Sequence, residues 1–426
     1  MQVEVEQFRA DGYLIIKNAV PPERLQDLRL SVEMMVDGEK ARALTTRKEG
    51  EPRGGSWYQS AQPRLNTDSI TAETADVLDF CLGETTLGVS QQLLHNPPFT
   101  ALTTFGALCS GLIDYGYTDW HRDYSSAEQA PLSGSQQNLM ENGPGYVQWN
   151  IALYDDDVFW ILPASHKHPT TEAQRRQLLL DPKSQLVGGV PVRLEAGDGV
   201  VYPNLMMHWG SSYTSRLRRT IHMGYRSFAG PTLPYAHQLE WHEKPGFLEY
   251  ASEQALAHFE TAAEHYDQEK RRIAAALRTI ISGQEQAFRA ALARLHPSEA
   301  GRMVAVVLMC RIANKVIRLH RPQIARMSVA ERRPLIDGSP PAHYAEDMAR
   351  RFSADEAGAL QRRFAELNRR LEADREASDR RYGEIYKELR PDAAQPPDFE
   401  SRPLRTFNSE MPADFGVAEF IASWGA

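Results

Sequence analysis

The spacing of apolar residues changes near residue 248, and this change divides the chain into two parts. Before it, short runs rich in Val, Ile, Tyr and Trp alternate with Gly, Pro and Asp, as is typical of strands separated by turns. The pattern predicts strands at residues 13–16, 146–153 and 199–202, and helices near 22–35 and 71–82. This part of the chain is therefore expected to be mainly β-structure.

After residue 248 the apolar positions follow the three-four spacing of helices. A predicted helix ends at Ser282-Gly283, and its apolar stripe consists of Leu256, Phe259, Ala263, Tyr266, Ile273, Leu277 and Ile280. A second helix is expected from the Pro297-Ser298 cap to about residue 319. Ser353 and Glu356 form a capping box, and the helix that follows carries Leu360, Phe364, Leu367 and Leu371 on one face.

These patterns predict an α+β protein with three regions. Residues 1–247 form a β-rich domain with flanking helices, and residues 248–390 form a helical domain. Residues 391–426 begin with a Pro- and Asp-rich stretch and are expected to be an extended tail. The helical stripes predict packing surfaces, which could cover the β-rich domain, form a homodimer through the C-terminal helices, or line part of the substrate pocket.

Composition indicates an ordinary soluble protein. The chain has 426 residues, of which 42% are apolar and 24% charged, and its net charge is −8. That charge argues against nucleic acid or an anionic membrane surface as a partner. The longest apolar run, 303–310, is too short to span a membrane, and the first residues do not resemble a secretion signal. Three widely spaced cysteines predict no disulfide framework, so a cytoplasmic location is expected.

The sequence around residue 121 carries the candidate chemistry. In a strand, His121 and Asp123 would face the same side with their Cα atoms roughly 7 Å apart, close enough to share one metal ion. His208 is the candidate for a third ligand from a distant segment. Two histidines and one carboxylate on one face of an octahedral ion leave three positions open, as in non-haem iron oxygenases. A His-x-Asp pair is common by itself, so the prediction depends on the residues around it.

Arginines follow His208 in the sequence and could supply the cation that the far carboxylate of a dicarboxylate cosubstrate on the metal would need. Arg219 lies eleven residues after His208, within a run that also contains Arg216 and Arg218. An arginine can bind a carboxylate through two parallel hydrogen bonds. Strand alternation puts Arg218 and Arg219 on opposite faces, so only one of them can serve, and the sequence argument favours Arg219.

Five ordered motifs in the first 230 residues resemble those of the phytanoyl-CoA dioxygenase family. In chain order they are the stretch 8–20 (FRADGYLIIKNAV), Trp120-His121-Arg122-Asp123, Leu162-Pro163-Ala164-Ser165-His166-Lys167, Ala196-Gly197-Asp198-Gly199-Val200, and His208-Trp209-Gly210-Ser211. The third has Ala164 in place of a glycine, and the last has one residue inserted. The resemblance does not extend beyond residue 248.

This resemblance implies the fold, the cofactors and the activity. It implies a double-stranded β-helix, a cupin-like jelly roll, that binds Fe(II), 2-oxoglutarate and O2. Its metal ligands would be His121, Asp123 and His208, with Ser211, Gln148 and Asn150 as further contacts to 2-oxoglutarate. The reaction implied is hydroxylation of a small organic molecule of specialised metabolism, with release of succinate and CO2.

Two other functions remain open at this point. A zinc or other divalent-metal hydrolase could use the same His/Asp/His ligands, although it would not need Arg219. A jelly-roll binding protein without catalytic activity would not need intact ligands. The polar, glycine-containing segment 124–145 follows the first two ligands directly and is expected to be either a lid over the substrate or a simple connection.

Overall fold

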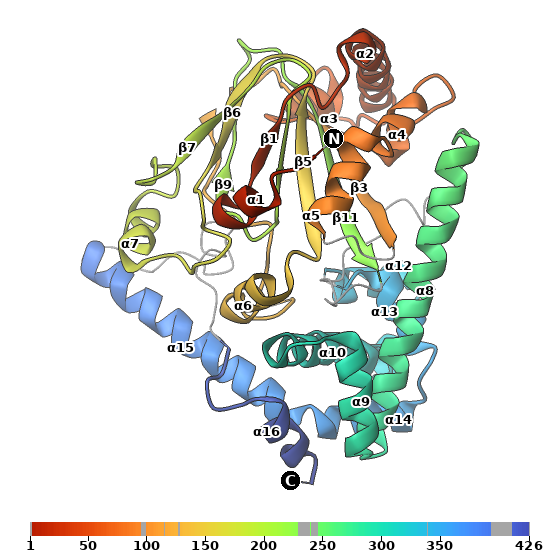
Figure 1. Ribbon diagram of the computed structural model, residues 1–426, viewed down its shortest axis with the longest axis vertical. Helices are drawn as coiled ribbons and strands as arrows, with labels where there is room; N and C mark the ends of the chain where they lie inside the picture. The colour runs from red at the N-terminus through yellow and green to blue at the C-terminus, as the bar shows by residue number, and fades with distance from the viewer. Residues whose placement is uncertain are drawn as a thin grey trace.

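The computed structural model places most of the chain in one body of strands above and helices below (Figure 1). It describes residues 2–94, 99–114, 116–126, 128–228, 239, 246–338, 340–392 and 411–425. Among the helices in these ranges, none is long and apolar enough to cross a membrane.

A six-stranded antiparallel sheet forms the larger β-layer. In spatial order its strands are β1 (Leu14–Ile16), β8 (Gly199–Tyr202), β5 (Tyr146–Ala152), β11 (Arg219–Phe228), β3 (Phe99–Cys109) and β2 (Arg64–Asn66). The predicted strands at 13–16, 146–153 and 199–202 are therefore confirmed. All seven residues of β5 are buried, because other strands or side chains cover both of its faces.

A second sheet has three strands, and it supplies one of the candidate ligands. Its order is β7 (Val190–Leu194), β6 (Asp156–Ile161) and β9 (His208–Trp209), and a separate pair consists of β10 (Ser211–Ser212) and β4 (Gly116–Tyr117). The chain passes from β5 in the large sheet to β6 and β7 in the small one, then returns through β8 and leaves again through β9. Consecutive strands of this part of the chain therefore belong to different sheets at three points, between β5 and β6, between β7 and β8, and between β8 and β9.

Short helices precede and interrupt the strands. Their bounds are α1 (Val5–Asp11), α2 (Pro22–Thr45), α3 (Gly55–Gln59), η1 (Thr67–Ser69), α4 (Asp76–Cys81), η2 (Glu84–Gly88), α5 (Val89–Leu93), α6 (Leu132–Asn142) and α7 (Glu172–Leu180). Helix α2 continues ten residues beyond the predicted end at 35, whereas the helix expected at 71–82 occupies only α4. The segment 124–145 contains α6 and is not simply a loop.

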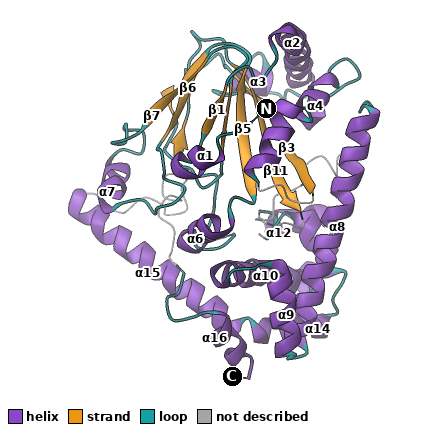
Figure 2. Ribbon diagram, in the orientation of Figure 1, coloured by secondary structure: helices purple, strands orange, loops and turns teal. Residues whose placement is uncertain are grey.

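Helices make up the described part of the chain after residue 252 (Figure 2). They are α8 (Glu253–Ile281), α9 (Glu285–Leu295), α10 (Glu299–Leu319), α11 (Pro322–Ala325), α12 (Val329–Ile336), α13 (Ala342–Ala349), α14 (Ala354–Arg363), α15 (Ala365–Leu389), α16 (Val417–Ala422) and η4 (Ser423–Gly425). The predicted helix ends at 282–283 and 297–298 are confirmed, as is the Ser353–Glu356 capping box. The helix after Ser353 is divided at Phe364, where the backbone leaves helical geometry.

The predicted extended tail is wrong in its last part. Residues 393–410 lie outside the described residues, but 417–422 form α16. Phe420 of α16 stacks on Phe364, with 5.2 Å between ring centroids. The chain end is therefore held by the helical region, because α16 buries its apolar face there.

The β-layer and the helical region share one continuous apolar core. Phe228 of β11 contacts Tyr266 of α8 edge to face, at 6.4 Å between ring centroids. Beside them Arg226, which is fully buried, forms a 2.7 Å ion pair with Glu269 of α8. A buried ion pair that loses one partner leaves an uncompensated charge in the core. The helical region is therefore packed as part of the same body as the sheets.

One histidine in the helical region predicts a loss of stability in acid. His296 follows α9 and is 1% exposed, and neither ring nitrogen has a hydrogen-bond partner among the described residues. Burial lowers the pKa of His296 to about 4, whereas an unfolded histidine titrates near ~6.5. The stability present above pH 6.5 is therefore lost as the pH falls toward 4, by up to roughly 3 kcal/mol.

Urea denaturation between pH 7 and pH 4.5 measures this loss. We expect His296→Leu to lose less stability than the unmodified chain over that interval, because its unfolded state takes up about one proton fewer. An equal loss in the two proteins would contradict the assignment.

Candidate metal centre

The three predicted ligands come together between the two sheets. His121 and His208 lie opposite each other in an isolated β-bridge, with backbone hydrogen bonds of 3.0 and 2.9 Å in the two directions. Each of His121, Asp123 and His208 offers one donor atom, and these atoms lie within 4.8 Å of one another. Through this bridge, two segments that are 87 residues apart in the chain (208 − 121) lie side by side.

Both imidazole rings are oriented by backbone carbonyls. Nδ1 of His121 lies 2.7 Å from the carbonyl oxygen of Asp119, and Nδ1 of His208 lies 2.9 Å from that of Met206. A carbonyl only accepts, so each Nδ1 carries the hydrogen and each Nε2 keeps a lone pair. The two Nε2 atoms face Asp123, at 3.7 Å from Oδ1 for His121 and 3.3 Å from Oδ2 for His208. This is the tautomer that a metal ligand requires.

Asp123 is held in its ionised form. Gln148 of β5 donates a 2.8 Å hydrogen bond to its Oδ2. Burial alone would raise the pKa of Asp123, but the charge of His208 and His121 in their protonated form, together with the hydrogen bond from Gln148, holds that pKa well below its usual value before a metal ion replaces those protons. A carboxylate that stays charged at all ordinary pH values is a ready ligand for a cation.

The ligands open into a cavity of about 240 Å³. His121 and His208 lie in its wall, with exposed side-chain fractions of 7% and 6%, whereas Asp123 is 38% exposed. The rings of Phe159 and Tyr202 pack around His208, at centroid distances of 5.5 and 5.2 Å. The apolar wall fixes the ring of His208 and leaves the carboxylate side of the site open.

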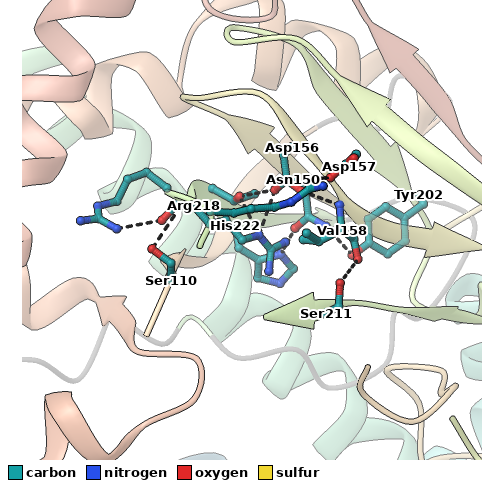
Figure 3. A network of polar contacts seen from close by, with 12 residues as sticks. Ser110, Asn150, Asp156, Asp157, Val158, Tyr202, Ser211, Arg218 and His222 are labelled. Carbon is teal, nitrogen blue, oxygen red and sulfur yellow. Dashed lines mark hydrogen bonds and ion pairs between the residues drawn. The ribbon is translucent and has the colours of Figure 1, made fainter. Parts of the chain in front are cut away.

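Arg218 lines the same cavity and is held there by polar contacts that include Asp156 (Figure 3). Its Nε lies 2.9 Å from Oδ2 of buried Asp156, and Thr220 donates a 2.8 Å hydrogen bond to the same oxygen. Its buried Nη1 has no hydrogen-bond partner among the described residues. Burial alone would raise the pKa of Asp156. The charge of Arg218 and a hydrogen bond from the Val158 amide outweigh burial and hold that pKa below its usual value. Arg218 is thus a fixed cation with a donor free for an anion in the cavity.

The structure does not support Arg219 in the role that the sequence argument gave it. Its side chain lies on the opposite face of the sheet and forms an ion pair with Glu33 of α2, at 2.8 Å. Strand alternation was correctly expected to separate the two arginines, and it places Arg218 on the cavity side. The count from His208 favoured Arg219, because it cannot say which face of β11 is turned inward.

Of the three other residues that were predicted to contact 2-oxoglutarate, two line the cavity and one does not. Gln148 and Asn150 line the cavity. Asn150 also contacts Tyr202, and Nδ1 of His222 lies 2.9 Å from its Oδ1. Ser211 is buried in β10, where its hydroxyl reaches the Val158 carbonyl at 3.4 Å, and it is not among the residues that line the cavity.

Several residues that line the cavity were not predicted as site residues, and the two that bear on its chemistry are His222 and Arg64. His222 follows Arg218 by four positions, so strand alternation could have placed it on the same face. Burial lowers the pKa of His222 to about 4, which makes it a neutral hydrogen-bonding group. Arg64 of β2 also lines the cavity, and no sequence motif marked it.

The donors present fit a divalent metal and a dicarboxylate. Two imidazole nitrogens and one carboxylate suit iron(II), and by donor type they would also suit zinc. The free Nη1 of Arg218 supplies a donor for a carboxylate in the same cavity.

Comparison with known proteins gives one family match. A family model described as phytanoyl-CoA dioxygenase (PhyH) matches residues 8–221. No curated protein matches the chain.

Several solved structures are similar to part of the chain. AviO1 from Streptomyces viridochromogenes Tue57 is 20% identical, with 54% of this chain and 96% of that chain covered and a TM-score of 0.38. HygX from Streptomyces hygroscopicus, with nickel and 2-oxoglutarate bound, is 18% identical over 53% and 88% of the two chains, also at 0.38. EctD from S. alaskensis, with 2-oxoglutarate and 5-hydroxyectoine, is 15% identical over 57% and 82%, again at 0.38. Scores this low carry no argument about substrate or reaction.

Proposed function

Because the chain belongs to the phytanoyl-CoA dioxygenase family, we propose that it hydroxylates a small organic molecule, using iron(II), 2-oxoglutarate and O2. The observation that carries the proposal is the set of His121, Asp123 and His208 around one point, with both Nε2 lone pairs directed at it. The family and the metal site thus agree on an oxygenase. The reaction and the class of substrate are our proposal.

In this proposal His121, Asp123 and His208 hold the metal. The chemistry that iron(II) would supply when bound is the activation of O2, one oxygen atom of which oxidises 2-oxoglutarate to succinate and CO2 while the other enters the substrate as the hydroxyl. Asp123 occupies a ligand position that halogenating relatives leave free for chloride, which favours hydroxylation. The cavity of about 240 Å³ at the ligands has the scale of a small-molecule site, which supports a small organic substrate.

We further propose that Arg218 binds the far carboxylate of 2-oxoglutarate. Its ion pair with Asp156 fixes the guanidinium, and its Nη1 remains available inside the cavity. Gln148 orients Asp123, and Asn150 with His222 forms a neutral polar wall. The task of these residues is to bind and orient the reactants and to keep water away from the reacting carbon.

The two sheets are proposed to form the double-stranded β-helix that the family resemblance implies. The support is the path of the chain, which alternates between the sheets from β5 through β6, β7 and β8 to β9. Residues 1–247 and 248–390 are proposed to be two parts of one folding unit, because one apolar core runs through both. Residues 229–238 and 240–245, beside that limit, lie outside the described residues. A homodimer through the C-terminal helices stays a prediction.

Anaerobic addition of iron(II) and 2-oxoglutarate tests the proposed function. We expect the weak visible charge-transfer band of the metal–2-oxoglutarate chelate in the unmodified chain and its loss in His121→Ala. The physical reason is that His121 supplies one of the two nitrogen ligands, and its Nε2 is already turned toward the site.

The band also separates this function from the alternatives. Folded protein that gives no band, or a band that persists in His121→Ala, would count against an oxygenase. Metal-dependent hydrolysis without a band would favour the zinc hydrolase, which shares the donor set.

A further inference from the structure

The helical region reaches the metal ligands through a chain of buried hydrogen bonds. It starts at Arg122, which stands between His121 and Asp123 in the sequence and is 3% exposed. Nη1 of Arg122 donates to the carbonyl of Ser165 at 2.7 Å and also to that of Leu205, and Nη2 donates to the carbonyl of His168 at 3.2 Å. Arg122 thus ties the first ligand pair to two other segments.

Ser165 extends this connection to the third ligand. Its hydroxyl accepts a 2.8 Å hydrogen bond from the amide of Met207, the residue before His208. Leu205, which Arg122 also contacts, lies three residues before His208. The turn that contains Ser165 and His168 is therefore bonded to both ligand-bearing segments.

Helix α6 is bonded to the same turn. Gln136, which is 2% exposed, donates from Nε2 to the Ser165 carbonyl at 3.1 Å and to the His168 carbonyl at 2.7 Å. These are two of the three carbonyls that Arg122 uses. A shift of α6 would thus move the acceptors that hold Arg122 in place.

Helix α10 fixes α6 and the connecting segment, by which we mean the chain between Asp123 and Leu132. Arg311 of α10 donates from Nε to the Gln129 carbonyl at 3.1 Å and from Nη2 to the Ser126 carbonyl at 3.3 Å. Burial lowers the pKa of Arg311, as expected for a guanidinium enclosed by the segment that it holds. At the other end of α6, Asn142 donates to the Ser298 hydroxyl at the start of α10, at 2.8 Å.

We propose that the helical region positions the metal ligands, and that Arg311 is the positioning residue through which α10 does so. Arg311 fixes the connecting segment, that segment and α6 fix the Ser165–His168 turn, and the turn fixes Arg122 and the approach to His208. Figure 1 shows α6 between the strands and α10. The inference rests on one part of the proposed function, namely that the three ligands hold a metal. It gives the region after residue 248 a role in metal binding.

Metal binding, measured apart from turnover, tests this proposal. Cobalt(II) is titrated into the metal-free chain and followed by its visible absorption, and Arg311→Met is compared with Arg311→Lys and with Arg318→Met. Methionine keeps the length and apolar stem of arginine but removes both donors. We expect Arg311→Met to bind cobalt(II) about 10-fold more weakly, the lower end of the effect of losing a group bonded directly to a ligand, because Arg311 acts through intervening residues. Arg311→Lys should recover part of this affinity.

Arg318→Met is the matched control. Arg318 also belongs to α10, but it donates to the Leu335 carbonyl, away from α6. Its loss should leave cobalt(II) affinity within twofold of the unmodified chain. Thermal unfolding of the metal-free proteins separates a local effect from a general loss of stability, and amide hydrogen exchange in the connecting segment should increase only in the Arg311 variants.

The proposal is overturned if Arg311→Met binds cobalt(II) as tightly as the unmodified chain, or if Arg318→Met weakens binding equally. If Arg311→Met does not fold, Gln136→Met interrupts the same connection at α6 and decides the question in the same titration. Failure of the proposed function has a different signature: the unmodified chain would bind cobalt(II) but give no band with iron(II) and 2-oxoglutarate.

Discussion

Asp123→Ala should abolish 2-oxoglutarate turnover by removing the only negatively charged ligand of the metal. The remaining ligands, His121 and His208, are neutral, so the variant would have to hold a doubly charged ion with nitrogen donors alone. Loss of a group that merely orients a ligand costs roughly 10- to 100-fold in metal affinity, and we expect loss of the ligand itself to exceed about 100-fold. Equilibrium binding of iron(II) and the release of succinate measure the two effects.

A surface aspartate provides the control for this substitution. Asp157 pairs with Arg216 at the surface, where an ion pair contributes little to stability or function. Asp157→Ala should therefore retain metal binding and turnover. If Asp123→Ala binds iron(II) as well as Asp157→Ala does, Asp123 is not a ligand and the proposed centre is wrong.

Arg218→Lys should raise the KM for 2-oxoglutarate by about 10- to 100-fold, since a charge-assisted hydrogen bond contributes roughly 1.5–3 kcal/mol. Lysine preserves the positive charge beside buried Asp156 but lacks the planar fork that serves two partners at once. It can satisfy Asp156 or the cosubstrate, and not both. Steady-state kinetics with 2-oxoglutarate as the varied reactant measures the change.

Arg219→Lys separates this interpretation from the one that the sequence favoured. Arg219 pairs with Glu33 on the other face of the sheet and does not line the cavity, so its substitution should leave the KM for 2-oxoglutarate within about twofold of the original value. A large increase in KM for Arg219→Lys, with little change for Arg218→Lys, would restore the first assignment and contradict the structure.

The contrast between these two arginines shows what the sequence could predict. The ligands could be found because type and spacing restrict them: a histidine and an aspartate two positions apart, followed by a distant histidine with family motifs around it. The choice between Arg218 and Arg219 depends on which face of β11 points inward. That face is set by the register of β11 with β3 and β5, which involves residues more than 60 positions away. No local pattern contains that information.

The helical region was predicted as helices, with part of the substrate pocket as one of three possible roles, but no residue of it was assigned to the site. The apolar stripes on α8 and α10 show which face of each helix is buried, but they do not show which segment covers that face. The Arg226–Glu269 ion pair and the bonds from Arg311 to Ser126 and Gln129 are contacts between distant segments. Helix α6 was missed inside 124–145 because it begins after Pro131 without a side-chain cap and carries a mixed polar surface.

The unequal exposure of the three ligands has a consequence for how fast the centre fills and empties. Carbonyl oxygens hold both imidazoles in the wall, so these two donors are ready before an ion arrives. Asp123 stands at the open side and is the ligand that an incoming hydrated ion meets first. An ion would then exchange its water step by step, carboxylate first and imidazoles afterwards. Loading and removal by chelators would both use this open side, and a bound cosubstrate, lying in the same cavity, would slow both.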